Sequence, residues 1–173
     1  MKCKTMTKNK LAFLTMLAGA VLSLPVAQAQ TWSSVASTCE PGSDSIGLFA
    51  YSNGSFLFAS GETGKIATRC ALTNPMDSGV PAWKTLTAGF QDPDGHDGDY
   101  EIQVSLERVN KSTGVHTIIV TLDSNSYTGT GAQSQHVAFT HTFNFTTYAY
   151  YVLMSVSRND SNAAPSVWFA SLT

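Results

Sequence analysis

The sequence predicts an all-β fold: an antiparallel two-sheet sandwich of the immunoglobulin-like or jelly-roll type, with about nine strands and one disulfide. Three observations support this class. No window longer than ten residues repeats apolar residues with the 3.6-residue period of a helix. Short alternating segments are instead separated by Gly, Asn and Asp. Ser, Thr, aromatic and β-branched residues are abundant, whereas Leu and Lys are scarce after residue 29.

The first 29 residues have the organisation of an export signal. Four lysines precede an uncharged apolar run from Leu11 to Leu24, and Ala27-Gln28-Ala29 follows it as a signal-peptidase site. The run has about 14 residues, whereas a membrane-spanning helix needs about 20. We therefore expect residues 1–29 to be removed. Residues 30–173 should then form a single β-sandwich domain without a membrane span, secreted or periplasmic.

The charge left after cleavage excludes one class of partner. The signal contains four of the ten Lys and Arg residues and none of the twelve Asp and Glu residues, so the remaining chain carries six cations, twelve carboxylates and a net charge of −6. Nucleic-acid binding requires clustered Lys and Arg to neutralise phosphates. We therefore expect no nucleic-acid partner and no adsorption to anionic membranes.

Two cysteines remain in the exported chain. Cys3 is removed with the signal, while Cys39 and Cys70 stay. Two cysteines in an exported protein most simply pair, because the extracytoplasmic environment is oxidising. A loop of about 30 residues closed in this way would stabilise the fold by roughly 3–4 kcal/mol in the chain-entropy model. A catalytic thiol or a metal-binding pair is the alternative, and no CxxC spacing supports it.

The first predicted hairpin turns at Asn53-Gly54, the dipeptide most typical of a tight two-residue turn. Pairing across this turn places Tyr51 opposite Phe56 and Phe49 opposite Phe58. Four aromatic side chains then share one side of the hairpin. That side is expected to be buried between layers or to face a ligand.

The second predicted hairpin joins 100–109 to 115–123 through a five-residue loop. Apolar residues then alternate with polar ones on both strands, which indicates a sheet with one buried and one solvated side. The expected apolar pairs are Leu106 with Ile118, Val104 with Val120, and Ile102 with Leu122.

A third hairpin is expected between 135–145 and 148–157, turning at Thr146-Thr147. An apolar stripe supports this pairing, although β-branched threonines resist the positive φ of a tight turn. His141 would lie on the apolar side of this hairpin. Further strands are expected at 65–72, 83–90 and 165–172.

One loop is strongly acidic. Asp92, Asp94, Asp97 and Asp99 lie in the connection between two predicted strands. Calcium prefers six to eight oxygen ligands, several of them carboxylates, so these four residues are the candidate calcium site. The spacing does not match an EF-hand. Asp-Pro-Asp-Gly is also a typical turn sequence, so an exposed turn without a metal is the alternative interpretation. No cofactor is otherwise required.

Aromatic residues supply the candidate binding surface. Trp83, Tyr151 and Trp168 are the rings expected to stack on a ligand, although core packing explains most aromatic residues. The sequence has no G-x-S-x-G motif and no zinc-binding histidine spacing. We therefore expect a non-enzymatic exported domain that binds a carbohydrate or a protein surface. The alternatives are a subunit of a surface or adhesive assembly, and a small secreted hydrolase.

Overall fold

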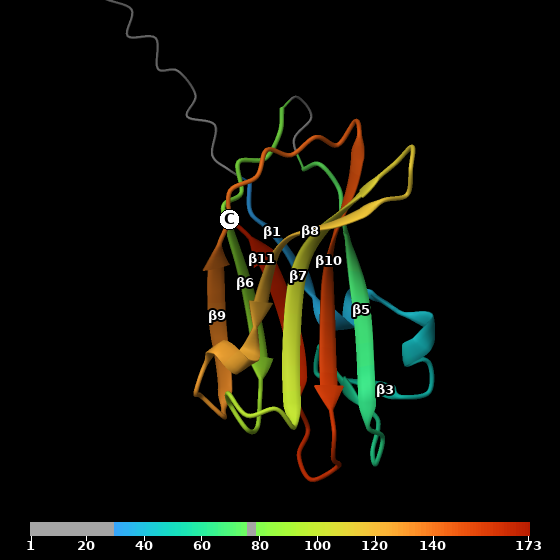
Figure 1. The fold of residues 1–173 in the computed structure, drawn as a ribbon, viewed down its shortest axis with the longest axis vertical. Helices are drawn as coiled ribbons and strands as arrows, with labels where there is room; N and C mark the ends of the chain where they lie inside the picture. The colour runs from blue at the N-terminus through green and yellow to red at the C-terminus, as the bar shows by residue number, and fades with distance from the viewer. Residues whose placement is uncertain (1–29, 76–78) are drawn as a thin grey trace, which may run out of the picture.

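The computed structural model describes residues 30–75 and 79–173, so the predicted signal segment lies outside the described residues. The all-β prediction is confirmed: eleven strands form two antiparallel sheets, joined by loops and three short 3-10 turns (Figure 1). The expected count of nine omitted two short strands near the start of this region, β1 and β2. No helix in the described ranges has the length and apolarity required to cross a membrane.

Sheet A has six strands in the order β3-β4-β11-β6-β9, and β1 pairs with β11 beside this path. Its central strand β11 therefore contacts β1, β4 and β6. The strands of sheet A are β1 (Trp32–Val35), β3 (Phe49–Ser52), β4 (Ser55–Phe58), β6 (Thr85–Gln91), β9 (Ala132–Ala138) and β11 (Ser166–Leu172).

Sheet B has five strands in the order β2-β5-β10-β7-β8. The long strand β10 is its centre and pairs with β5 on one side and β7 on the other. The strands of sheet B are β2 (Glu40–Pro41), β5 (Gly64–Leu72), β7 (Tyr100–Asn110), β8 (His116–Asp123) and β10 (Tyr148–Arg158), and the 3-10 turns are η1 (Ala36–Thr38), η2 (Ser43–Ser45) and η3 (Ser124–Ser126).

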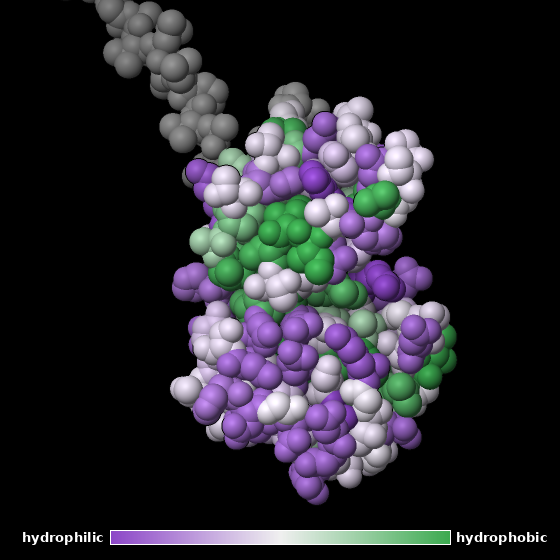
Figure 2. Space-filling model, viewed as in Figure 1, coloured by the Kyte–Doolittle hydropathy of each residue, from purple (hydrophilic) through white to green (hydrophobic). Residues whose placement is uncertain are grey.

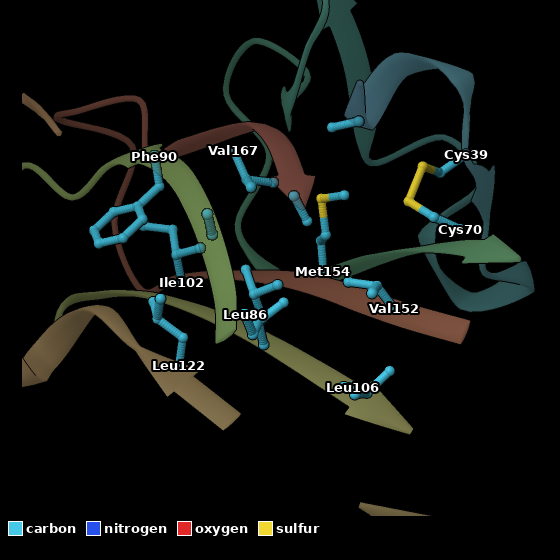
Figure 3. Close-up of a cluster of buried hydrophobic side chains, with 14 of the residues drawn as sticks. Cys39, Cys70, Leu86, Phe90, Ile102, Leu106, Leu122, Val152, Met154 and Val167 are labelled. Carbon is cyan, nitrogen blue, oxygen red and sulfur yellow. A yellow bond between two sulfur atoms is a disulfide. The ribbon is translucent and has the colours of Figure 1, made fainter. Parts of the chain in front are cut away.

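The core fills the space between the sheets. Sheet A contributes Leu86, Phe90 and Val167, and sheet B contributes Ile102 and Met154, all fully buried (Figure 3). The predicted disulfide is confirmed and joins Cys39, just after η1, to β5 through Cys70. Figure 2 shows an apolar area in the upper half of the view and a mostly hydrophilic surface below it.

The hairpin between β3 and β4 is confirmed with the predicted register, Phe49 opposite Phe58 and Tyr51 opposite Phe56. Asn53 and Gly54 have φ angles of 50° and 87°, the positive values that a type I′ turn requires. The aromatic side is partly buried: Phe56 is inaccessible, while Tyr51 at the edge is 41% exposed.

The hairpin between β7 and β8 forms, but its predicted register is wrong. Leu106 faces Val120, Val104 faces Leu122, and a bulge beyond Leu106 places Ile118 opposite Glu107 on the outward side, where it is 61% exposed. Asn110 was expected in the loop, but its N–H donates to the carbonyl oxygen of Val115. The hydrogen bond between these two residues leaves four residues, 111–114, in the turn. The extra bulge residue accounts for the rest of the shift.

The third predicted hairpin does not form. β9 pairs with β6 in sheet A, whereas β10 pairs in sheet B, and residues 139–147 cross between the sheets. The apolar residues of this segment pack around a core tryptophan: Phe143 lies 5.1 Å from Trp83 and 5.0 Å from Tyr150 between ring centroids. Burial of these rings between the layers replaces the tight turn that the threonines disfavour.

Candidate functional site

The outward side of sheet B carries a row of polar side chains held in fixed positions. Val104 and Leu106 of β7, and Val152 and Met154 of β10, point into the core. The alternation of a strand therefore directs the intervening side chains outward. The polar face is defined here as Arg69 of β5, Ser105 and Glu107 of β7, His116 of β8 and Tyr151 of β10.

Four members of the polar face form a hydrogen-bonded network. Glu107 accepts from Ser105 Oγ at 2.7 Å through Oε1 and from Tyr151 Oη at 2.5 Å through Oε2. Because the Tyr151 proton is directed to Glu107, the His116 Nδ1–H donates to the Tyr151 oxygen, 3.0 Å away. Ser105 and Glu107 are only 6% and 8% exposed although they point away from the core. The network therefore orders these groups before any ligand arrives.

Tyr151 acts as a neutral hydroxyl in this network. Burial, the hydrogen bond to Glu107 and the charge of that carboxylate raise the pKa of Tyr151 to about 12, against the opposing effect of Arg69. The phenol is therefore protonated throughout the physiological range. Its ring stays partly exposed and meets the His116 ring edge-on, with 6.2 Å between the centroids.

A pocket of about 240 Å³ adjoins the polar face. The turn η2 forms one wall and β5 the other, and Arg69 belongs to both the pocket and the polar face. Ser45 fixes η2 on β5, because its Oγ accepts from Ala67 N–H at 2.8 Å and donates to the Ala67 carbonyl oxygen at 3.2 Å. The lining residues are Gly42, Ser43, Asp44, Ser45, Lys65, Ala67 and Arg69.

The three predicted stacking residues do not share a surface. Tyr151 lies on the outward side of sheet B as part of the polar face. Trp168 lies on the outward side of sheet A, over Gly89, where an added Cβ would be 2.3 Å from the Trp168 Nε1 atom. Trp83 is inaccessible and donates through Nε1 to the Gln30 carbonyl oxygen at 2.5 Å. The prediction of an exposed stacking ring is therefore wrong for Trp83.

A second cavity of about 280 Å³ lies between residues 80–84 and 140–143 and has Trp83 and Phe143 in its lining. His141, which also lines it, lies in the crossing segment instead of the predicted strand, with Nε2 3.2 Å from Tyr150 Oη. Burial, with a contribution from the Arg108 charge, lowers the pKa of His141 below its usual value. The ring is therefore neutral at physiological pH, and its main contacts are aromatic.

The acidic loop contains a pair of carboxylates, Asp92 and Asp94, each with a buried oxygen; this is called the buried pair here. Asp92 is inaccessible, and its Oδ2 accepts from Ser124 Oγ. Asp94 Oδ2 accepts from the N–H groups of Asp99 and Tyr100 at 2.9 and 3.1 Å. The remaining oxygens, Asp92 Oδ1 and Asp94 Oδ1, are buried and have no hydrogen-bond partner while both carboxyls are ionised. When Asp92 is protonated, the two side chains can hydrogen-bond to each other.

The other two acidic residues do not join this pair. Asp97 and Asp99 are exposed. Within residues 30–75 and 79–173, no three side chains among His, Cys, Asp and Glu are placed to hold a metal ion. Burial, followed by the hydrogen bond and charge of Asp94, raises the pKa of Asp92 to about 7. The loop therefore brings two of the four predicted ligands together.

The polar face does not have the arrangement of a nucleophilic catalytic site. The Ser105 proton is directed to Glu107, and His116 contacts Tyr151 instead of a serine. A serine nucleophile needs an adjacent base that accepts its proton and then returns it to the leaving group. The network is instead a set of fixed donors and acceptors around a partly exposed aromatic ring.

No protein-family model and no curated protein matches the chain. Similar solved structures include the carbohydrate-binding module CBM36 in complex with calcium and xylotriose (TM-score 0.45, 11% identity, 82% of this chain and 99% of that one). The xylan-binding module CBM15 has a TM-score of 0.49 and 10% identity over 83% of this chain and 96% of that one. A family two carbohydrate esterase from Cellvibrio japonicus has a TM-score of 0.40 and 17% identity over 83% of this chain, which spans about a third of the esterase (33%).

Proposed function

We propose that residues 30–173 form an exported, non-enzymatic carbohydrate-binding domain whose ligand lies on the polar face. The network of Ser105, Glu107, Tyr151 and His116 carries this proposal. Sugars present hydroxyl groups as both donors and acceptors, and they present apolar ring faces. A surface that holds carboxylate, imidazole and phenol groups in place beside an aromatic ring meets both requirements.

Preorganisation is the physical advantage of this arrangement. Flexible polar side chains lose rotamer freedom when they bind, at a cost of about 0.5–1.5 kcal/mol for each immobilised chain. Glu107 and Tyr151 are already held by hydrogen bonds of 2.5–2.7 Å in the free protein. Binding a ligand therefore adds little ordering cost at these two residues. The cleavable signal predicted at 1–29 fits a ligand outside the cytoplasm.

Replacing Tyr151 by alanine should weaken oligosaccharide binding at least tenfold, because the ring and the hydroxyl are both lost. Tyr151→Phe keeps the ring and should lose less affinity. Isothermal titration calorimetry with xylotriose, cellotriose and mannotriose would measure the effect. Trp168→Ala, on the opposite side of the sandwich, is the matched control and should bind as wild type. Loss of binding in Trp168→Ala alone would place the ligand on sheet A and refute the polar face.

We further propose that a calcium ion binds at the buried pair of the acidic loop, with Asp92 and Asp94 as its carboxylate ligands. Two buried oxygens that have no hydrogen-bond partner when both carboxyls are ionised support this assignment, since calcium prefers anionic oxygen ligands and compensates for their burial. Bound calcium would hold the loop between β6 and β7 in one conformation. Asp97 and Asp99 are not needed for this smaller site.

Calcium at millimolar concentration should raise the melting temperature of the wild-type protein, because a ligand that binds only the folded state stabilises it. Asp94→Asn should abolish this rise, while Asp97→Asn, a change in an exposed residue of the same loop, should retain it. Differential scanning calorimetry with calcium, with magnesium and with EDTA would test this. An equal rise in all three proteins would contradict a site at Asp92 and Asp94.

A further inference from the structure

The pocket between η2 and β5 concentrates positive charge on an acidic chain. Residues 30–173 contain only six Lys and Arg residues against twelve carboxylates, and Lys65 and Arg69 both line this one pocket. Two of the other cations are committed elsewhere. Arg158 is 5% exposed and donates to the Asp160 carbonyl oxygen, while Arg108 stacks on the Tyr148 ring at 4.3 Å.

The guanidinium of Arg69 has a defined place in this pocket. An added Cβ at Gly42 would lie 3.5 Å from the Arg69 Nη1 atom, so the guanidinium lies against the backbone of the segment that leads into η2. That segment is fixed, because Gly42 N–H donates to the Ala67 carbonyl oxygen at 2.8 Å. Arg69 is also close enough to Tyr151 to oppose the rise in its pKa. One side chain therefore connects the pocket with the polar face.

The pocket has a net excess of positive charge. Its lining contains Lys65, Arg69 and a single carboxylate, that of Asp44. Lys65 and Arg69 are both exposed, so their charges are available to a ligand. A planar guanidinium binds a carboxylate through two parallel hydrogen bonds, and a nearby ammonium adds a second charge-assisted contact.

We propose that this pocket binds the carboxylate of an acidic sugar, a uronic acid unit of a glycan that lies on the polar face. The inference rests on the proposed function and specifies its ligand class. Arg69 and Lys65 contact the carboxylate, and Asp44 and Ser43 are the groups available to the ring hydroxyls. A volume of about 240 Å³ is below the range of roughly 300–1,000 Å³ typical of drug-sized ligands, which fits a single sugar unit.

Methyl β-D-glucuronoside and methyl β-D-glucoside differ only at the sixth carbon, which is a carboxylate in the first and a hydroxymethyl group in the second, and NMR titration with both would test the proposal. The glucuronoside should bind the wild type at least tenfold more tightly than the glucoside, and Arg69→Gln should remove this difference. Arg69→Lys keeps the positive charge but loses the planar guanidinium, so it should retain part of the preference for the glucuronoside. Lys84→Gln removes an exposed cation outside the pocket and should bind as wild type. Raising the salt concentration should weaken binding of the glucuronoside alone.

Equal affinity for the two glycosides, or an Arg69→Gln variant that still prefers the glucuronoside, would overturn the proposal. Competition by poly-glutamate at the same carboxylate concentration would also overturn it, in favour of an acidic peptide. These outcomes leave the polar face open to a separate test, since Tyr151→Ala should weaken binding of neutral oligosaccharides in any case. Matching melting temperatures of wild type and Arg69→Gln would confirm that the exposed substitution leaves the fold intact.

Discussion

Replacing Asp92 by asparagine is expected to raise the free energy of unfolding at pH 8 in EDTA by roughly 3–4 kcal/mol. The folded protein holds this carboxyl with a pKa of about 7, whereas the usual value is 3.8. Between these two values the folded state binds more protons than the unfolded state. The stability of the wild type therefore falls as the pH rises from about 4 to about 7. Asparagine is neutral at every pH and avoids the cost of a buried charge.

Urea unfolding between pH 4 and pH 8 in EDTA would measure this effect. The wild type should lose stability across the interval, and Asp92→Asn should lack this component of the loss. Asp97→Asn, which neutralises an exposed carboxylate of the same loop, should follow the wild type. Calcium should reverse the order at pH 8, because only the wild type keeps both carboxylate ligands. Parallel curves for wild type and Asp92→Asn would contradict the assignment of the high pKa to Asp92.

Trp83→Ala should destabilise the protein by about 3–5 kcal/mol, because it removes the largest inaccessible side chain and leaves a cavity in the core. The variant also loses the edge-on contact with Phe143 and the hydrogen bond to Gln30. Chemical denaturation monitored by circular dichroism would give the change in free energy. The result also bears on function, because replacing a core tryptophan destabilises the fold and affects ligand binding only indirectly.

Trp168→Ala is the comparison for this measurement. The same residue type is removed, but from the partly exposed outward side of sheet A, so the loss should be clearly smaller. A Trp83→Ala variant as stable as wild type, with impaired ligand binding, would contradict the core assignment. It would restore Trp83 as a stacking residue.

The elements that sequence patterns predicted correctly depend on local chemistry. Asn53-Gly54 determines both the turn and its register, because few other dipeptides adopt two consecutive positive φ angles. The disulfide followed from two cysteines after residue 29 and from the prediction that this part of the chain is exported. The strand positions of β5, β6 and β11 were also predicted within a few residues, since alternation alone indicates them.

The errors in strand pairing and register arise where tertiary contacts, and not local sequence, determine which residues pair. The apolar stripe through Phe139 and Phe143 reads equally well as a hairpin strand or as a segment that crosses between sheets, and only the position of Trp83 distinguishes the two. The register of β7 against β8 failed by two residues because Asn110 closes a shorter loop and a bulge follows it. Bulges have no reliable sequence signal.

The candidate site was predicted only in part. Tyr151 was expected to carry an outward ring, and alternation on β10 places it on that side. The alternation predicted for the second hairpin also places Ser105 and Glu107 on the solvated side of β7, but their link to Tyr151 depends on β7 and β10 being neighbours. Arg69 and His116 come from two further strands. Strand order determines this cluster, and strand order was not predictable from the sequence.

The position of β11 affects how the protein reaches its folded state. This strand, Ser166–Leu172, is the last along the chain, yet it binds β1, β4 and β6 at the middle of sheet A. Pairing of Trp32 with Leu172 spans almost the whole described chain, and contacts of such long range slow folding. Sheet A therefore cannot close until β11 has been synthesised and has reached its place between β1, β4 and β6. Until then, the edges of β1, β4 and β6 that pair with β11 have no hydrogen-bond partners. A chaperone that shields these edges would be useful during this period.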